Sequence, residues 1–517
     1  MLALDLKEET PTKLFNTKRH SHPYSFRTKT ASKVIGKIDY NFASATQNMG
    51  ISMSVEPDSV PAMINSYIAA HYLHSPVDRA CVNALPDTIL QPTAKGVAVL
   101  EKFCNVFNIE HPYQQTLFKS SLNTLSLIYL TRSARTNKLD VSPALLVVLW
   151  NSMLGKEPQV WDGKRRKSLS PYYHQWLLHP SGNSVSQYYN CNGLHLFKNL
   201  SFVCKSDEKL CIDYTMTGRG IWQWLLDCTD IIASAEAFQL TRLFISAGFI
   251  RRIEGVPSHE GITCEDNLPK ELSRTCFYQI SNPGYVACDW NEQLELDPQI
   301  CVFTAWTVNG GTLFGGGNVK DKKDCPDPIC APELDYMQST EEIIVRKLVP
   351  KGDSKASSVD SLDDPVQFNL DLILNDPGLT LLFKSILDRT RSSESLFFIQ
   401  ELLGLRALIE RAYQQSATTG AATLMIKPWQ ALVTIIYRYI AVNSPLEVNI
   451  PEGCRQAILQ TMPSSRVSQN QMESAMRTAV EKLKVAESHC RALLTGMIPI
   501  LVRDPMLDLL AMSLKAI

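Results

Sequence analysis

Apolar residues recur at helical spacing through much of the C-terminal part of the chain. In ESLFFIQELLGLRALIERAY the apolar positions step by four, three, four and three residues, and they are Phe398, Leu402, Leu405, Ile409 and Ala412. This spacing gathers them on one face of an α-helix, which predicts a buried stripe. The same kind of pattern returns several times, so residues 366–512 are predicted to form an all-helical domain.

Residues that favour helix starts divide this region into several predicted helices. Asp376 and Pro377 are placed as the cap and the first residue of one helix, and Leu379, Phe383 and Ile386 are then expected to face inwards. A long later helix is expected to have one apolar side, which comprises Met472, Met476, Ala479, Leu483, Ala486, Cys490, Leu493 and Met497. The stretch DPMLDLLAMSL then predicts a short last helix.

Two shorter modules are predicted upstream, at residues 31–112 and 196–290. In the first, a helix is expected to present one apolar face, made of Val60, Ile64, Tyr67 and His71. Thr93 is placed to cap a second helix of that module.

In the module at 196–290, Ser234 is placed to cap a helix and Gly248 to end it in a left-handed turn. The face of this helix that is expected to be buried comprises Ala237, Leu240, Phe244 and Ala247. FIRRI then predicts a strand, and TCFYQISNPGYVACDW predicts a strand, a Pro-Gly turn and a second strand. The module is therefore expected to combine a helical core with a small β wing.

Three segments separate or precede these modules. Residues 1–30 are polar and basic and are predicted to be a flexible arm. Residues 113–195 are predicted to be a helical connector. Residues 291–365 contain a glycine-rich stretch and the polar run KGDSKASSVDSLDDP, which predict loop and disordered linker.

The charge balance gives no global attraction to nucleic acid or anionic lipid. Lys plus Arg total 51 and Asp plus Glu total 52, for a formal net charge of -1. Four arginines of the 196–290 module offer some local positive charge, but not the basic face that phosphate neutralisation needs. No stretch approaches about 18 apolar residues, so no membrane span is expected. Protein partners are favoured over nucleic acid.

No metal or cofactor site is predicted from the cysteines and glycines. The 14 cysteines are scattered, which fits reduced thiols better than a disulfide framework. Cys325 and Cys330 have no second Cys or His pair close by, so zinc is disfavoured. NGGTLFGGGNVK lacks the Gly-Lys-Ser/Thr ending of a phosphate loop, and nucleotide binding is rejected.

The order of motifs in the C-terminal region resembles the RGS domain of the regulators of G-protein signalling. The motifs are DP with FKSIL, then SSESLFFIQE, then IYRYIAVNSPLEVNIPEGCRQAI, then a long helix that ends in PILVRDPMLDLL. SPLEVNI and the helix after it are the most specific part. The resemblance covers roughly residues 366–512 and implies a helical bundle that binds a heterotrimeric G-protein α subunit (Gα).

The upstream modules resemble DEP domains, which are winged-helix relatives. MTGRGIWQWLLDCTDIIASAEAFQLTRLFISAGFIRRI carries the resemblance in the second module, and the first module, with PDSVPAMINSYIAAHYLH and TILQPTAKGVAVLEKFC, is more degenerate. The expected fold class is thus multidomain and mainly α, with two winged-helix-like α+β modules before an RGS bundle. This combination resembles fungal regulators that desensitise receptor signalling.

The RGS resemblance implies a Gα-binding surface made of Ser393, Glu394, Ser395, Glu447 and Asn449. It implies no catalytic residue, because Gα supplies the arginine and glutamine of the reaction, and the RGS domain preorganises the mobile switch segments. Asn449 would face the switches, which requires it to be exposed. The alternatives are that Asn449 is an ordinary turn residue and that Glu394 is a carboxylate at a helix start.

Two departures from the family pattern leave the activity open. Ser395 stands where the family usually has asparagine, and Thr495 and Pro499 stand in the expected last loop, where many members have an aspartate and an arginine. Arg503 or Asp504 could partly substitute. The first hypothesis is therefore a GTPase-activating protein for Gα, and the alternative is a scaffold that binds Gα or a receptor without speeding hydrolysis.

The resemblance also implies partners and a location. DEP modules imply binding to a receptor's cytoplasmic tail and peripheral membrane association, so the protein is expected in the cytoplasm and at the inner face of the plasma membrane. No cofactor and no nucleic acid are expected.

Overall fold

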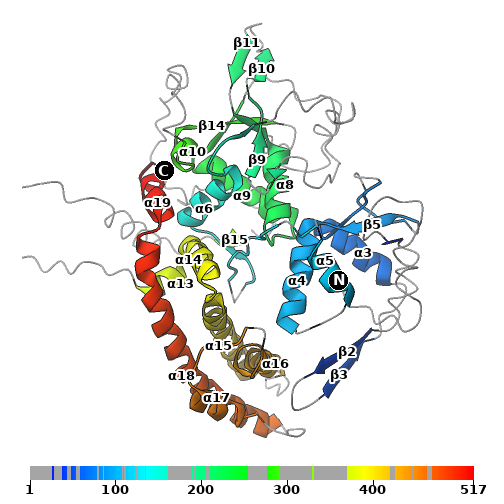
Figure 1. Ribbon diagram of the computed structural model, residues 1–517, viewed down its shortest axis with the longest axis vertical. Helices are drawn as coiled ribbons and strands as arrows, with labels where there is room; N and C mark the ends of the chain where they lie inside the picture. The colour runs from blue at the N-terminus through cyan, green and yellow to red at the C-terminus, as the bar shows by residue number, and fades with distance from the viewer. Residues whose placement is uncertain are drawn as a thin grey trace, which may run out of the picture.

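The computed structural model shows a mainly helical protein with several small β-sheets (Figure 1). It describes residues 26–27, 38–43, 48–53, 59–160 and 189–253 with short gaps, 276–290, 329–330, 369–419, 426–462 without 445, and 469–516. The predicted linker 291–365 lies outside the described residues except for strand β15, Ile329–Cys330. All statements below concern the described part of the chain.

The N-terminal module combines a three-stranded antiparallel sheet with helices. The strand order is β1-β5-β4, with Phe26 of β1 paired to Leu90 of β5. Its elements are β1 Phe26–Arg27, α3 Val60–Ala69, β4 Leu73–His74, β5 Ile89–Pro92, α4 Ala94–Phe107 and α5 Pro112–Phe118. Between β1 and α3 the chain also forms a hairpin of β2 Ile38–Ala43 and β3 Asn48–Met53. Strand β1 falls within the predicted arm 1–30 and pairs with β5. The rest of 1–30 lies outside the described residues, so the flexible arm stays a prediction.

The caps in this module are only partly as predicted. Thr93 caps α4 by accepting a hydrogen bond from the Gly96 nitrogen at 2.9 Å, which confirms that prediction. Helix α3 ends at Ala69, and His71 adopts a left-handed conformation with φ 61°. The buried face of α3 is therefore Val60, Ile64 and Ile68. The prediction that His71 lies on the helix is wrong, because the helix stops before it.

The second module has a three-stranded antiparallel sheet of order β12-β14-β13. Its elements are β12 Thr215–Thr217, α8 Gly218–Cys228, α9 Ser234–Ser246, β13 Ile250–Arg252, β14 Phe277–Ile280 and α10 Asn282–Val286. Short strands lie before it: β7 Gln159–Val160, β8 Tyr189–Asn190, β9 Gly193–Leu196, β10 Leu200–Val203 and β11 Lys209–Ile212. The predicted helix face is buried and Gly248 has φ 73°, so both predictions are confirmed.

Two local predictions for this module are wrong. Ala233 occupies the cap position of α9, and Ser234 is already helical, so no side chain caps this helix. The segment after Ser281 forms helix α10 instead of a strand, because Pro283 stands in its first turn, where its fixed φ favours a helix. Gly284 of α10 lies so close to Phe249 that a Cβ would meet the carbonyl oxygen of that residue.

The C-terminal region is all-helical, as predicted. Its elements are α13 Leu370–Asn375, α14 Pro377–Thr390, α15 Ser393–Thr419, α16 Ile426–Ile435, the π-helical turn η5 Ile436–Ile440, α17 Glu452–Leu459, α18 Gln469–Val502 and α19 Pro505–Ala516. Asp376 caps α14 by accepting from the Gly378 and Leu379 nitrogens at 2.8 and 2.9 Å. The predicted stripe on α15 is buried except for Ile409, which is partly buried.

Helix α6, Pro143–Leu154, joins the second module to the C-terminal helices (Figure 1). It comes from the predicted connector 113–195, just after β6, Leu139–Asp140, which pairs in parallel with β15. It packs on α14 and α19 on one side and on α9 and β9 on the other. One contiguous hydrophobic core therefore runs through both regions. The prediction of separate modules misses this shared core.

Polar contacts fix the α6 junction. Ser142 caps α6 by accepting from the Leu145 nitrogen at 3.1 Å and lies 3.2 Å from Asp376. The Trp150 ring nitrogen donates to the Gly284 carbonyl at 2.9 Å. Burial raises the pKa of Asp376, against hydrogen bonds from its own helix and Ser142. A buried carboxylate thus sits where two helices begin.

Helix α18 needs comment because of its length and composition. Residues Met472–Val502 are long and apolar enough to cross a membrane on those two criteria alone. That corrects the expectation that no stretch approaches this limit. The helix packs on α13, α14, α15, α16 and α17, and its buried side is Met476, Ala479, Leu483, Ala486, Cys490, Leu494 and Ile498. We therefore describe it as a packed helix of the bundle.

Candidate functional site

The candidate site centres on the loop 441–451, between η5 and α17. Val448 is fully buried and Ile450 is 7% exposed, whereas Asn449 between them is exposed. The Ile450 nitrogen donates to the Val448 carbonyl at 3.0 Å, which makes Asn449 the central residue of a three-residue turn. The amide of Asn449 makes no hydrogen bond to any described residue. Asn449 is therefore presented outwards by two buried neighbours.

Arg455 on α17 holds this loop from beneath and is only 5% exposed. Its guanidinium donates to the Ile440 carbonyl at 2.7 Å and to the Val448 carbonyl at 3.3 Å. These carbonyls lie at the start and near the end of the loop. The Val448 nitrogen also donates to the Tyr439 carbonyl at 2.9 Å. The loop is thus closed by three hydrogen bonds to its two ends.

Glu447 has both carboxylate oxygens engaged inside this loop. One oxygen lies 2.9 Å from the Arg455 guanidinium. The other accepts from the Asn443 nitrogen at 2.9 Å, and Asn443 has a left-handed φ of 61°. Sequence reasoning named Glu447 as a partner contact. The geometry shows that its carboxylate organises the loop, although the residue is exposed at its edge.

The start of α15 supplies the other predicted site residues. Ser393 and Glu394 are partly exposed in the first helical turn. Burial raises the pKa of Glu394, against a backbone hydrogen bond that lowers it. A carboxylate in this position also meets the positive end of the helix dipole, so the helix-start alternative for Glu394 stays open.

Ser395 does not belong to the accessible surface. Its side chain is fully buried and lies beside Cys490 of α18, a thiol whose pKa burial raises to about 11. The direct partner contact expected through Ser395 is not available in this arrangement. The physical reason is helical periodicity: position 395 faces the bundle on the same side as Phe398 and Leu402, which are also buried.

A ring contact links the start of α15 to the turn before the loop. The rings of Phe398 and Tyr439 are 5.5 Å apart, and they join α15 to the turn before the loop. The second turn of α15 therefore packs against the turn that precedes the loop 441–451.

The expected last loop is helical. Thr495 and Pro499 are exposed on α18, which continues to Val502. Leu494, Ile498 and Leu501 on the opposite side are buried. Burial of this side helps the helix to continue past Pro499, which has no N–H to donate to the Thr495 carbonyl. The expectation that Thr495 and Pro499 lie in a loop is wrong here, because α18 continues through both residues.

Arg503 and Asp504, the two proposed substitutes, do not replace the aspartate–arginine pair that many family members have. Asp504 accepts from Arg389 at 2.9 Å and from the Met506 nitrogen at 2.9 Å, so it pairs with α14 and caps α19. Arg503 is exposed at the α18–α19 turn. A charged group for a partner is therefore available at Arg503, whereas Asp504 is already engaged.

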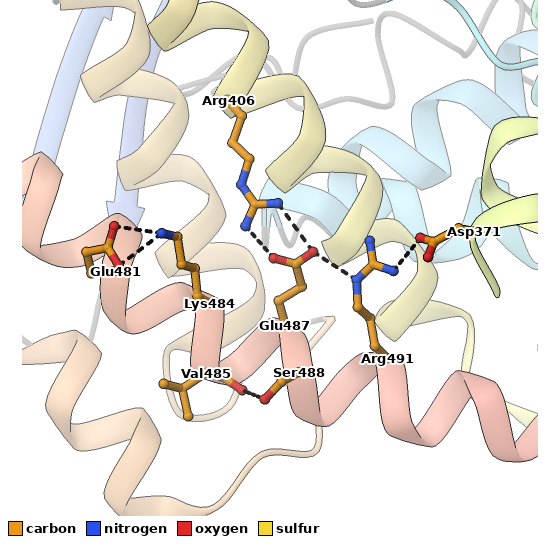
Figure 2. A network of polar contacts seen from close by, with 8 residues as sticks. All are labelled: Asp371, Arg406, Glu481, Lys484, Val485, Glu487, Ser488 and Arg491. Atoms are coloured by element: carbon orange, nitrogen blue, oxygen red, sulfur yellow. Dashed lines mark hydrogen bonds and ion pairs between the residues drawn. The ribbon is translucent and has the colours of Figure 1, made fainter. Parts of the chain in front are cut away.

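A charged network that the sequence did not reveal braces the bundle beside this site (Figure 2). Glu487 of α18 is 6% exposed, pairs with Arg406 of α15 and accepts from Arg491 at 3.0 Å. Arg491 also donates to Asp371 of α13 at 2.7 Å. Burial raises the pKa of Glu487, but hydrogen bonds from the two arginines outweigh it, and the net shift is downwards. The network joins three helices through one buried carboxylate.

Among the described residues, no group of three or more His, Cys, Asp or Glu side chains could hold a metal ion. What the site offers is the exposed amide of Asn449 on a hydrogen-bonded loop and the partly exposed carboxylate of Glu394 at the start of α15. Such a surface can bind a protein and orient its groups, since it contains hydrogen-bond donors and acceptors.

Two comparisons with known proteins give a family match and a relative. Residues 1–120 match the family described as the fungal-differentiation regulator winged helix domain. The match agrees with the winged-helix-like fold expected for 31–112 and extends over the predicted arm 1–30. The chain is also 21% identical over 458 residues to the developmental regulator flbA of Emericella nidulans. That alignment covers 88% of this chain and 53% of the relative, so the chain spans about half of the relative's length.

Proposed function

We propose that this protein is a negative regulator of heterotrimeric G-protein signalling that acts as a GTPase-activating protein for a Gα subunit. The observation that carries the proposal is the exposed Asn449 on a loop whose ends are fixed by Arg455. The helical bundle, the motif order and the similarity to a fungal developmental regulator support it. The protein itself catalyses no covalent step in this proposal.

The mechanism is preorganisation of another enzyme. Gα already contains the arginine that stabilises the transferring phosphoryl group and the glutamine that orients the attacking water. The amide of Asn449 would contact the switch segments and that glutamine, with two donors and one acceptor. Fixing mobile segments in their reactive geometry lowers the barrier without adding a catalytic group, because the reorganisation is completed before the reaction.

Single-turnover hydrolysis of GTP on Gα tests this proposal. The full chain should accelerate hydrolysis, and Asn449→Ala should remove most of the acceleration while the thermal unfolding midpoint stays unchanged. Asn375→Ala is the matched control, because Asn375 is also exposed but lies at the end of α13. No acceleration of any Gα subunit of the host would overturn the proposal.

A scaffold that binds Gα or a receptor without speeding hydrolysis is the second candidate. Two observations favour it: Ser395 is buried, and the segment with Thr495 and Pro499 is helical. Binding to Gα loaded with GDP and aluminium fluoride separates the candidates, since this ligand mimics the transition state. A GTPase activator should prefer that form over GDP-bound Gα, and a simple scaffold should not.

The upstream modules carry the proposed recruitment. The winged-helix match at residues 1–120 and the second module at 196–290 would bind a receptor's cytoplasmic tail and hold the protein at the plasma membrane from the cytoplasmic side. Deletion of residues 1–120 should then lower co-sedimentation with receptor-containing membranes. Equal co-sedimentation of the shortened and full chains would exclude this role for the first module.

A further inference from the structure

We infer that Arg455 and Glu447 are positioning residues that set the orientation of Asn449, and the inference rests on the function proposed above. Neither side chain is needed as a partner contact. Arg455 is buried beneath the loop, and the Glu447 carboxylate is occupied within it. Together they form what we call the loop clamp, defined as Arg455, Glu447 and the carbonyls of Ile440 and Val448.

The clamp acts on the turn that presents Asn449. The Val448 carbonyl accepts from the Ile450 nitrogen at 3.0 Å and from Arg455 at 3.3 Å. The acceptor that closes the three-residue turn around Asn449 is therefore also the group that Arg455 holds. A change in the guanidinium would alter the turn directly, without touching Asn449.

Glu447 extends the clamp to the far side of the loop. It joins Arg455 at 2.9 Å and the Asn443 nitrogen at 2.9 Å. Arg455 also lies 3.3 Å from Glu452 in the first turn of α17. The guanidinium thus connects the end of η5, the loop and α17 at one buried point.

Only an arginine can make this set of contacts. The guanidinium directs several N–H donors along fixed, coplanar directions, whereas a lysine ammonium is a single point of charge. Arg455→Lys keeps the charge but cannot serve Ile440, Val448 and Glu447 at the same time. Glu447→Gln keeps the shape and the acceptor for Asn443 but loses the charge that faces Arg455.

The first experiment needs no partner protein. Hydrogen exchange of the Val448 amide, which donates to the Tyr439 carbonyl at 2.9 Å, reports whether the loop is held. Arg455→Lys and Glu447→Gln in the full chain should raise its exchange rate by about tenfold or more, the effect of losing one charge-assisted hydrogen bond. Arg477→Lys is the matched control, because its partner Glu473 lies on an exposed part of α18. Unchanged exchange in both clamp variants would overturn the inference.

The second experiment links the clamp to Asn449 through a double-mutant cycle in the GTP hydrolysis assay. Arg455→Lys alone should reduce the acceleration about tenfold or more. It should have almost no further effect in the Asn449→Ala background, because its effect passes through Asn449. Equal losses in the two backgrounds would show that Arg455 acts only on stability or on another contact.

The two failures can be told apart. If the native chain accelerates no Gα, the proposed function fails, and the Val448 exchange rate still decides whether the clamp orders the loop. If acceleration is present and Asn449→Ala abolishes it but the clamp variants retain full acceleration, the function stands and the positioning role is overturned.

Discussion

Replacing Gly378 with alanine tests whether α14 and α6 pack as closely as the structure shows. A Cβ at position 378 would lie 2.8 Å from the Ala144 Cβ and closer still to the backbone of Ala144 and Leu145. The neighbours are mainly backbone atoms, which cannot turn aside as a flexible side chain can. The start of α14 is also fixed, because Asp376 accepts from the Gly378 nitrogen at 2.8 Å.

Two opposing effects set the size of the change. Alanine in place of glycine favours a helix interior by about 1 kcal/mol. Overpacking a filled interface costs about 1–3 kcal/mol and sometimes more. Because α6 and α14 must move apart as whole helices, the cost should fall in the upper part of this range, for a net loss of up to about 2 kcal/mol. This corresponds to about 2–4 °C per kcal/mol in the thermal midpoint of a domain of 150–250 residues.

Thermal unfolding of the full chain, followed by circular dichroism, measures this loss. Gly404→Ala in α15 is the matched control, because nothing lies within 4 Å of its added Cβ. The control should raise the midpoint or leave it unchanged, whereas Gly378→Ala should lower it. An equal rise in both variants would refute the close packing of α14 on α6.

Three further outcomes follow from buried polar groups. Burial lowers the pKa of Lys95 to about 8, against nearby carboxylates that raise it. The unfolded chain therefore binds more protons at Lys95 than the folded chain between about pH 8 and 10.5, and the native protein should gain stability relative to Lys95→Met as pH rises through this window. Urea unfolding measures both free energies of unfolding, and a difference between them that does not change with pH would contradict the prediction. Ser395→Asn should lower the thermal midpoint without increasing GTPase acceleration, because the site is filled and buried. Glu487→Gln should destabilise the chain at pH 7, and the destabilisation should disappear as pH falls through the lowered pKa of Glu487. Thermal unfolding midpoints of both proteins, measured over a series of acidic pH values, check this.

Periodicity predicted the helical region well where one face alone is buried. On α18 the expected side is correct from Met476 to Cys490, and it shifts to Leu494 and Ile498 near the end. The shift arises because an α-helix turns by 3.6 residues, so a stripe drifts along a helix of 34 residues. The residue at which the buried side shifts cannot be predicted without the positions of the neighbouring helices.

The role of α6 could not be predicted in the same way. PALLVVLW is apolar on all sides, which indicates burial, but it does not say which elements cover it. Its partners α14 and α19 come from residues more than 200 positions away, and Asp376 before α14 lies beside Ser142. Contacts of this separation leave no local pattern in one sequence.

The exposure of Asn449 was predicted from the sequence, but the contacts of Glu447 and the burial of Ser395 were not. The motif SPLEVNI correctly placed Asn449 on the surface between two helices. It could not show that Glu447 turns inwards to Arg455, because a carboxylate in a loop is compatible with both orientations. The burial of Ser395 could have been found from its spacing to Phe398 and Leu402, which continues the stripe of α15 towards its start.

Helix α6 has a practical consequence for dissecting the protein. A fragment that begins at α13 lacks α6. It would expose the faces of α14 and α19 that α6 covers. A transplant of these helices into another protein should therefore carry residues 139–155 as a separate piece, supplied on the same chain or as a peptide. The C-terminal helical bundle and α6 are therefore one folding unit in space, although they are separate segments of the sequence.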